Sequence, residues 1–356
     1  MIFAYCRLRA LVSLLTFVNI RGWICANYIY IYIYIYLYTY IHIYIYTHTH
    51  THTYIYIDVL NPNIPTVVRI QDKGSRFVLL SSADYEKKMF SQLNNEVHYN
   101  QLQSDPTPKH ISVVERWCSK WLQRGEISPE VANWVNNQKA KPGVAFGNVK
   151  THQERNPLRL ITSCCGTPIE NLSALTEFYL QPLARKLPSF IKDTTDLLNR
   201  IEVINDSGPF PEGRLLVSWD VVSMFPNIDN NNLGLTAVKN ALDARERLMP
   251  STKCILEAVE ICLKPNHSFF QHSFLLQIYS TAMGPKNACS YADLAMGEID
   301  HKAKFCGPIR PALWWRYRDD IFDLWQQGLP ALKTFTQYTR NFNMKVDAGV
   351  RTCGKF

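Results

Sequence analysis

The chain has 356 residues, of which 47% are hydrophobic and 19% charged, and its formal net charge is +8. This is the composition of a globular protein with one large domain or two smaller ones. Ten cysteines without a C-x-x-C pair argue against a zinc knuckle and, in a chain this long, against a disulfide framework, so we expect reduced thiols inside a cell. The modest positive charge suits a phosphate-rich partner.

Residues 1–57 are predicted to be a low-complexity leader. Ile and Tyr alternate from Tyr28 to Tyr46, and Thr and His alternate from Thr47 to Thr53. An AT repeat translated as ATA-TAT and an AC repeat translated as ACA-CAC give these patterns, so we interpret the segment as microsatellite DNA, disordered or artefactual in the protein. Two arginines before the apolar run Ala10–Val18 imitate a signal peptide, but no clean cleavage site follows, and we discount this signal. Without the leader the net charge is +5, so a nucleic-acid surface must come from local placement of charge.

A hairpin is predicted after the leader. The apolar runs Val67–Ile70 and Phe77–Leu80 flank an Asp-Lys-Gly turn, which favours two short strands. Lys73 at the tip is either a cation for a phosphate ligand or an ordinary solvated turn lysine.

Helices are predicted from Ser82 onward. Ser112–Gln123 and Ser128–Asn137 are amphipathic pieces separated by Gly125. Three tryptophans of these pieces are expected in the core: Trp117, Trp121 and Trp134.

A basic antiparallel ribbon is predicted over Gly143–Ser163. It carries four side chains suited to phosphate, namely Lys150, His152, Arg155 and Arg159. Amphipathic helices are predicted to follow at Glu170–Leu187 and Ser189–Ile204.

A buried strand is predicted at Arg214–Asp220, and it ends in a lone acid. A carboxylate at the end of an apolar strand is costly to bury without a cation or hydrogen-bond donors. The alternative is that Asp220 merely turns the chain. A further strand, Phe269–Tyr279, runs into a turn with Gly284, and a helix to about Lys302 follows.

The segment Trp314–Phe322 is predicted to be a hairpin with Asp319 and Asp320 at its tip. Two adjacent carboxylates repel each other unless a cation holds them, and a hard divalent metal with oxygen ligands is the usual solution. The alternative is a solvated Asp-Asp turn. If the strand of Asp220 lies beside this hairpin, three carboxylates can hold two divalent ions, with the backbone carbonyl of Val221 as a further ligand.

Taken in order from about Val67 to the end, these segments resemble the reverse transcriptase of Penelope-like retroelements. Tyr317–Asp320 matches the Y-x-D-D box, and Asp220–Phe225 resembles the first catalytic strand. Thr281–Gly284 resembles the box that positions template and incoming nucleotide, and Phe342–Lys345 the motif that follows the catalytic hairpin.

The resemblance implies an α+β fold, the right-hand polymerase palm, in which an antiparallel sheet packs on helices. It places the fingers and connecting helices at 58–205 and the palm at 206–356, with the thumb missing. It implies RNA-directed DNA synthesis with two Mg²⁺ ions, or Mn²⁺ in their place, on an RNA template, a DNA primer and dNTPs. No membrane or protein partner is expected, and the location would be intracellular, in the nucleus.

The resemblance also assigns roles to residues. The catalytic and metal-binding set is Asp220, Val221 through its carbonyl, Asp319 and Asp320. The nucleotide-binding set is Lys73, Arg159, Phe225 as a steric gate against the ribose 2′-hydroxyl, Gln277 and Gly284. The nucleic-acid-binding set is Lys150, His152, Tyr317 and Lys345.

Two alternatives stay open. The chain departs from the family pattern at Pro226, Asp229, Ser280 and Cys289, and it ends at Phe356 before a thumb or a GIY-YIG endonuclease. These features fit a truncated, non-catalytic retroelement remnant that at most binds nucleic acid. An RNA-templated RNA polymerase shares the palm but usually has Gly before the Asp pair, where this chain has Arg318.

Overall fold

The computed structural model describes residues 65–74, 76–206, 214–221, 224–264, 267–278, 281–306 and 309–340, together with the backbone of the strands at 32–35, 41–46, 54–59 and 346–352. Two compact units divide the chain. The smaller comprises residues 1–69 and 76–85, and the larger comprises 70–75 and 86–356.

The smaller unit contains a three-stranded sheet and a two-stranded one. Its strands are β1 (Tyr32–Ile35), β2 (Ile41–Tyr46), β3 (Tyr54–Val59), β4 (Thr66–Ile70) and β5 (Phe77–Ser81). The first three form one sheet in the order β1-β2-β3, and β4 pairs with β5, which confirms the predicted hairpin. Within this unit the Arg69 Nε donates to the Tyr85 hydroxyl at 3.0 Å. Helix α2 (Ser82–Leu93) begins here and continues into the larger unit.

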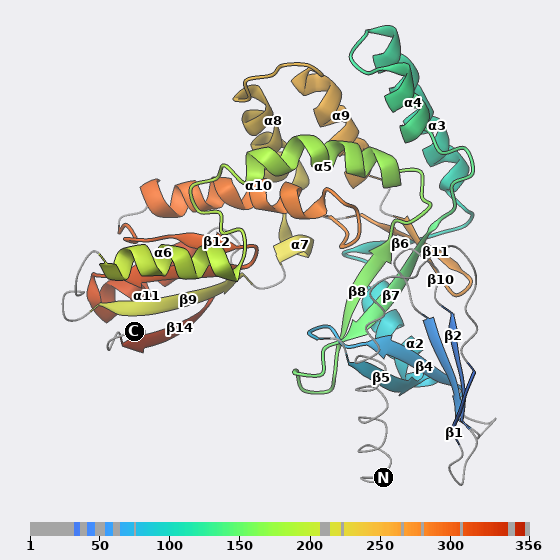
Figure 1. Ribbon diagram of the computed structural model, residues 1–356, viewed down its shortest axis with the longest axis horizontal. Helices are drawn as coiled ribbons and strands as arrows, with labels where there is room; N and C mark the ends of the chain where they lie inside the picture. The colour runs from blue at the N-terminus through green and yellow to red at the C-terminus, as the bar shows by residue number, and fades with distance from the viewer. Residues whose placement is uncertain are drawn as a thin grey trace. The chain divides into compact units, whose positions relative to one another are not determined.

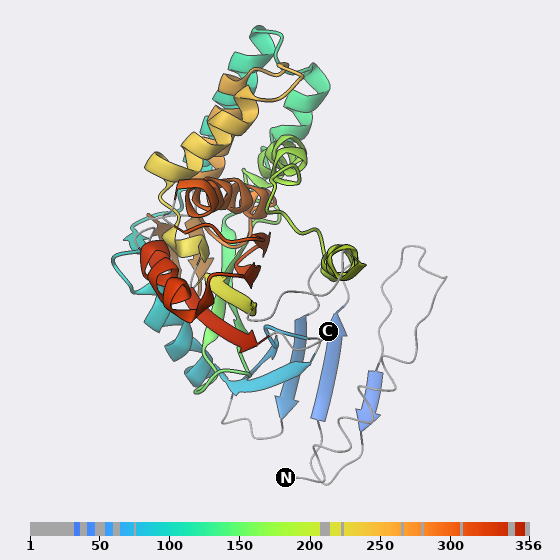
Figure 2. The ribbon, with the colours of Figure 1, turned by 90° about the vertical axis from the view of Figure 1, so that its left-hand side faces the viewer.

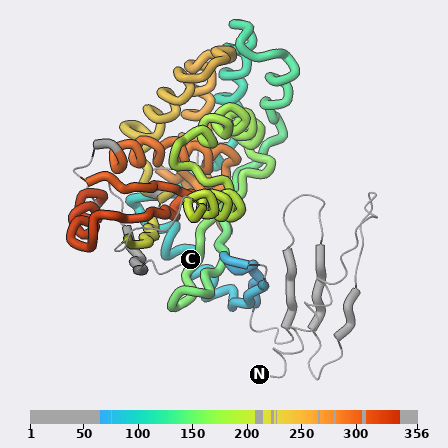
Figure 3. The backbone as a smooth tube through the Cα atoms, turned by 60° about the vertical axis from the view of Figure 1, so that its left-hand side comes forward, coloured from blue at the N-terminus to red at the C-terminus, as the bar shows by residue number. Residues whose placement is uncertain are grey.

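Most of the helices belong to the larger unit. They are, in order, α3 (Thr107–Gln123), α4 (Pro129–Val135), α5 (Glu170–Ala184), α6 (Thr194–Asp206), α7 (Met224–Asn227), α8 (Leu235–Asp243), α9 (Thr252–Leu263), α10 (Ala288–His301) and α11 (Gly328–Arg340), with π-helical turns at Asn230–Gly234 and Lys302–Cys306. Figure 1 shows α5 beside α10, and Figure 3 follows the backbone of these helices from teal at α3 to red at α11. No helix in the described part of the chain combines the length and the apolar character that a membrane crossing requires.

A four-stranded antiparallel sheet forms the centre of the larger unit. Its strands are β9 (Leu215–Val221), β12 (Trp315–Tyr317), β13 (Asp320–Trp325) and β14 (Val346–Thr352), in the order β12-β13-β9-β14. Alternate residues of β9 and β13 face a core, so Trp219 and Ile321 are buried. Helix α11 lies against the sheet (Figure 2). It covers that face through Phe335, whose ring centroid lies 5.6 Å from that of Trp219. The predicted antiparallel sheet packed on helices is therefore confirmed.

A second, five-stranded sheet contains the predicted basic ribbon. It has the order β6-β11-β10-β7-β8, with β6 (Tyr99–Leu102), β7 (Gly143–Val149), β8 (Leu158–Ser163), β10 (His267–Phe270) and β11 (Ser273–Gln277). Strands β7 and β10 are parallel, and the other neighbours are antiparallel. The predicted single strand Phe269–Tyr279 is wrong, because the chain turns back at Gln271, whose φ is 51°, to form the hairpin β10–β11.

Two further predictions need correction. Trp117 and Trp121 are buried as expected, but Trp134 is 48% exposed, because α4 turns Ala132 and Val135 towards the core instead. Helix α6 starts at Thr194 and contains no buried residue among those described, so its amphipathic pattern does not mark a core helix.

Candidate active site

A two-residue turn joins β12 to β13 and carries the predicted carboxylates. Tyr317 pairs with Asp320, which leaves Arg318 and Asp319 as the turn. Arg318 has a φ of 58°, a left-handed conformation that such tight hairpins require and that residues other than glycine rarely adopt. The sequence pattern therefore predicted the hairpin correctly but placed its tip one residue too late, because Asp320 is already the first residue of β13.

The register of the sheet brings the third acid to this turn. Asp220 of β9 lies directly opposite Asp320 of β13, and the Val221 N–H donates to the Asp319 carbonyl at 2.9 Å. Opposite residues of an antiparallel pair have Cβ atoms about 4.5–5.5 Å apart and point to the same face. Because Trp219 and Ile321 point into the core, Asp220 and Asp320 project from the other face of the sheet, where both are exposed. On the far side of β9, the backbone of Asp347 pairs with Asp220.

The electrostatics of Asp320 reflect this crowding of acids. Burial raises the pKa of its carboxyl group, and the negative charges of Asp319 and Asp220 raise it further. The positive charge of Lys73 acts in the opposite direction. The three carboxylates thus concentrate negative charge at this end of the sheet, and the positive charge of Lys73 partly offsets it at Asp320.

These acids fit divalent metal ions by the chemistry of their donors. Carboxylate oxygens are the ligands that Mg²⁺ prefers, and Mg²⁺ usually keeps water or substrate phosphate oxygens in its remaining positions. Within the described ranges, no group of three or more His, Cys, Asp or Glu side chains lies close enough together to hold a metal ion as the side chains stand. Asp220, Asp319 and Asp320 nevertheless supply the type of donor atom that such an ion needs, and they are neighbours at this end of the sheet.

The predicted phosphate-binding residues lie near one another. The tip that carries Lys73 is anchored by the Asp72 N–H, which donates to the Val149 carbonyl of β7 at 2.8 Å. Arg159 of β8 approaches Asp72, with 2.5 Å between its Nε and the Asp72 Oδ1. Arg159 is thus engaged with the residue before Lys73, so in this structure it holds the tip, while the Lys73 side chain is exposed.

Three predicted nucleotide contacts lie on separate elements. Phe225 on α7 is half-buried and packs against the main core, while Gln277 is buried at the end of β11. Gly284 is exposed, but a Cβ atom there would overlap the carbonyl oxygen of Thr162. The glycine is therefore required by a close approach to β8, which differs from the approach to a ligand that we expected.

The predicted nucleic-acid contacts are placed only in part. Lys150 and His152 lie in the connection between β7 and β8, half-buried and exposed respectively. Tyr317 is 48% exposed next to the turn. Lys345, with the motif that contains it, lies outside the described residues.

A buried ion-pair network beneath the turn was missed by the sequence analysis. Arg316 is 1% exposed, and it contacts Asp293 and Asp300 of α10 with N···O distances of 3.1 and 2.8 Å. The sequence did contain a signal for this network. Asp293 and Asp300 are seven residues apart in an apolar helix, a spacing that puts both acids on one helix face, and Arg316 lies in an aromatic strand.

Solved structures with a similar fold include telomerases. The apo telomerase from Candida tropicalis truncated from the C-terminal domain aligns with a TM-score of 0.52 at 10% identity, over 81% of this chain and 60% of that one. The telomerase from Candida albicans in complex with the TWJ fragment of telomeric RNA aligns with a TM-score of 0.54 at 9% identity, over 82% of this chain and 49% of that one. No family model matches the sequence. The comparison with curated proteins gave no significant match.

The chain thus has a fold similar to that of these telomerases, with a four-stranded antiparallel sheet and a second, five-stranded sheet. It spans about half to three-fifths of the length of those telomerase chains. At this level of identity the likeness establishes the fold alone. The Penelope-like lineage expected from the motifs is not supported by these comparisons.

Proposed function

We propose that this chain is the palm and fingers part of an RNA-directed DNA polymerase. The observation that carries the proposal is the pairing of Asp220 with Asp320 at the tip of the Tyr317–Asp320 hairpin. The fold shared with telomerases supports it, because it is a fold in which nucleotides are polymerised.

In the proposed reaction a primer 3′-hydroxyl attacks the α-phosphate of a dNTP, and pyrophosphate leaves. Two divalent ions held by Asp220, Asp319 and Asp320 would activate the attacking oxygen and stabilise the leaving one. Lys73 opposes the charge of these acids in the free protein and would turn to the triphosphate when the nucleotide enters. Phe225 would exclude a ribose 2′-hydroxyl.

We further propose that the chain derives from a Penelope-like retroelement. The order of the motifs supports this lineage, since the first catalytic strand, the Gly284 box and the Y-x-D-D box follow one another as in that family. The genomic DNA beside this reading frame provides the test. Codons for a thumb and a GIY-YIG endonuclease are expected downstream. The lineage would be contradicted if these codons were absent and the flanking DNA instead encoded the other parts of a telomerase.

The activity is tested by extension of a labelled DNA primer on an RNA template with Mg²⁺ and dNTPs. We expect the 58–356 fragment to extend the primer, and Asp319→Ala to abolish extension while thermal unfolding is unchanged, because the exposed tip carries little of the core. Asp243→Ala removes an acid whose side chain is 48% exposed and paired with Lys239, and it serves as the matched control with full activity.

Extension by Asp319→Ala at the rate of the parent would refute the metal assignment. A folded parent that never extends a primer but binds RNA would support the alternative of a non-catalytic remnant.

A further inference from the structure

The buried network under the turn has a geometry that a simple core ion pair does not need. Arg316 uses its whole guanidinium group: Nε donates to Asp300 Oδ2 at 2.8 Å, Nη1 to Asp293 Oδ1 at 3.1 Å, and Nη2 to the Asp293 carbonyl at 3.0 Å. Its Nη1 also donates to the carbonyl of Arg318 at 3.0 Å. One side chain therefore joins helix α10 to the backbone of the turn that carries the acids.

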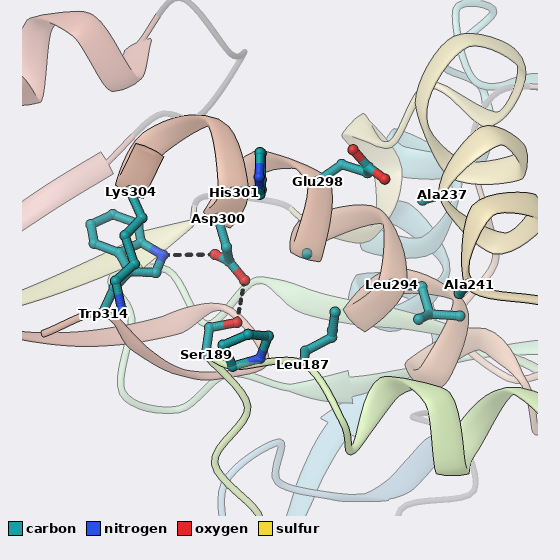
Figure 4. A pocket seen from close by; sticks show the side chains of 12 residues that line it. Leu187, Ser189, Ala237, Ala241, Leu294, Glu298, Asp300, His301, Lys304 and Trp314 are labelled. Carbon is teal, nitrogen blue, oxygen red and sulfur yellow. Dashed lines mark hydrogen bonds between the residues drawn. The ribbon is translucent and has the colours of Figure 1, made fainter. Parts of the chain in front are cut away.

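The carboxylate of Asp300 accepts hydrogen bonds from three side chains. It accepts from Trp314 Nε1 at 2.8 Å and from Ser189 Oγ at 2.6 Å, in addition to Arg316 (Figure 4). Asp300, Ser189 and Trp314 also border a cavity of about 370 Å³ between α8 and α10. Because Asp300 cannot move without breaking three hydrogen bonds, it fixes the position of Arg316.

The backbone of Arg316 is fixed as well. Its N–H donates to the Ser189 carbonyl at 2.6 Å, and its carbonyl accepts from the Ile191 N–H at 2.9 Å. On the other side of the turn, Arg318 forms an ion pair with Asp293. The left-handed Arg318 is thus held through its carbonyl by Arg316 and through its guanidinium by Asp293.

We infer that Arg316, Asp293 and Asp300 form a positioning clamp that sets the distance of the Asp319–Asp320 pair from Asp220 and so determines the affinity of the site for divalent metal. The clamp touches neither substrate nor metal, and it acts through the turn backbone. A buried ion pair is weak evidence for stability, and fixing a conformation is a better-attested use of one. The inference rests on the proposed function only for the assumption that the three acids bind divalent metal. The contacts that form the clamp are independent of that assumption.

The guanidinium geometry determines which variants are informative. Arg316→Lys keeps the charge but cannot reach Asp293, Asp300 and the Arg318 carbonyl at once. Arg318→Ala removes the partly exposed partner of Asp293 and leaves the buried core intact, so it tests the clamp even where Arg316→Lys fails to fold. Asp323→Asn is the matched control, because Asp323 is a fully buried acid on the neighbouring strand β13 and accepts its hydrogen bond from the Leu313 N–H, away from the turn.

The experiment measures Mn²⁺ binding by electron paramagnetic resonance, amide hydrogen exchange of the peptide spanning 316–321, and the Mg²⁺ dependence of primer extension. Loss of a residue that orients metal ligands typically weakens metal affinity by about 10- to 100-fold. We expect Arg316→Lys and Arg318→Ala to weaken Mn²⁺ binding, and to raise the half-saturating Mg²⁺ concentration, by about 10- to 100-fold. The turn amides should exchange faster in both variants, and primer extension should recover at high Mg²⁺. Asp323→Asn should leave all three unchanged.

Unchanged Mn²⁺ binding and unchanged exchange in folded Arg316→Lys or Arg318→Ala would overturn the clamp. A parent chain that binds Mn²⁺ but does not extend a primer would overturn the polymerase proposal alone, because the binding and exchange measurements still decide the clamp.

Discussion

Asp323 shows how a single residue can carry a chemical property that its sequence position hides. It lies on β13, three residues after Asp320, on the face that points into the core, and it is fully buried. Burial raises the pKa of its carboxyl group to about 7, while hydrogen bonds from the backbone N–H groups of Leu313 and Leu324 and the charge of Lys304 oppose that rise. One oxygen, Oδ2, has no hydrogen-bond partner.

This raised pKa predicts how stability depends on pH. In the unfolded chain the carboxyl titrates near 3.8, so between there and about 7 the folded state binds the extra proton. Stability therefore falls as pH rises through this window, by at most about 4 kcal/mol at roughly 1.4 kcal/mol per pKa unit. Asp323→Asn should remove this slope when urea unfolding is followed from pH 5 to pH 8. An equal slope in parent and variant would show that Asp323 does not titrate in the window.

At the scale of elements, the connection after β11 is packed more tightly than its sequence suggests. The Thr162 N–H of β8 donates to the Met283 carbonyl at 2.9 Å, and the next residue, Gly284, lies against the Thr162 carbonyl. This contact joins the five-stranded sheet to the start of α10, the helix that carries Asp293 and Asp300.

Gly284→Ala is therefore expected to destabilise the larger unit. The new methyl group would overlap backbone rather than a movable side chain, and overpacking of this kind costs about 1–3 kcal/mol. Equilibrium urea unfolding measures the loss. Gly125→Asn is the matched control, because Gly125 has a φ of 68°, which Asn tolerates, and no atom lies within 4 Å of a Cβ built there. A Gly284→Ala protein as stable as the control would show that β8 can move away.

At the scale of the whole molecule, the distribution of charge matters more than its sum. The net charge is +8 for the chain and +5 without residues 1–57, which carry three arginines and no acid. Such a small excess cannot by itself hold a polyanion, so binding must depend on local sites such as the connection between β7 and β8. Lys150 and His152 lie there.

The 58–356 fragment should therefore bind a primer–template with the affinity and salt dependence of the full chain. Lys150→Met should weaken binding and lower the slope of log affinity against log salt by about 0.7–0.9, the value for one phosphate contact. Fluorescence anisotropy between 50 and 200 mM salt measures both. A smaller slope for the fragment than for the full chain would assign phosphate contacts to residues 1–57.

The sequence by itself determined the elements whose signals are short-range. The apolar run before Asp220, the hairpin around Asp319 and Asp320, and the capped helix at Ser128 follow from side-chain alternation, turn residues and a hydroxyl that caps the Val131 N–H. These patterns depend on neighbours a few residues away, so they survive without knowledge of the rest of the fold.

Only the tertiary structure decided which distant residues meet. The pairing of Asp220 with Asp320, the four acceptors around the Arg316 guanidinium, the exposure of Trp134 and the burial of Asp323 depend on strand register and on helix packing between segments far apart in the chain. A shift of register by one residue would move each side chain to the other face of the sheet. The hairpin of Tyr317–Asp320 could thus be predicted from the sequence. Only the fold shows that Asp220 pairs beside it and that Arg316 holds its turn.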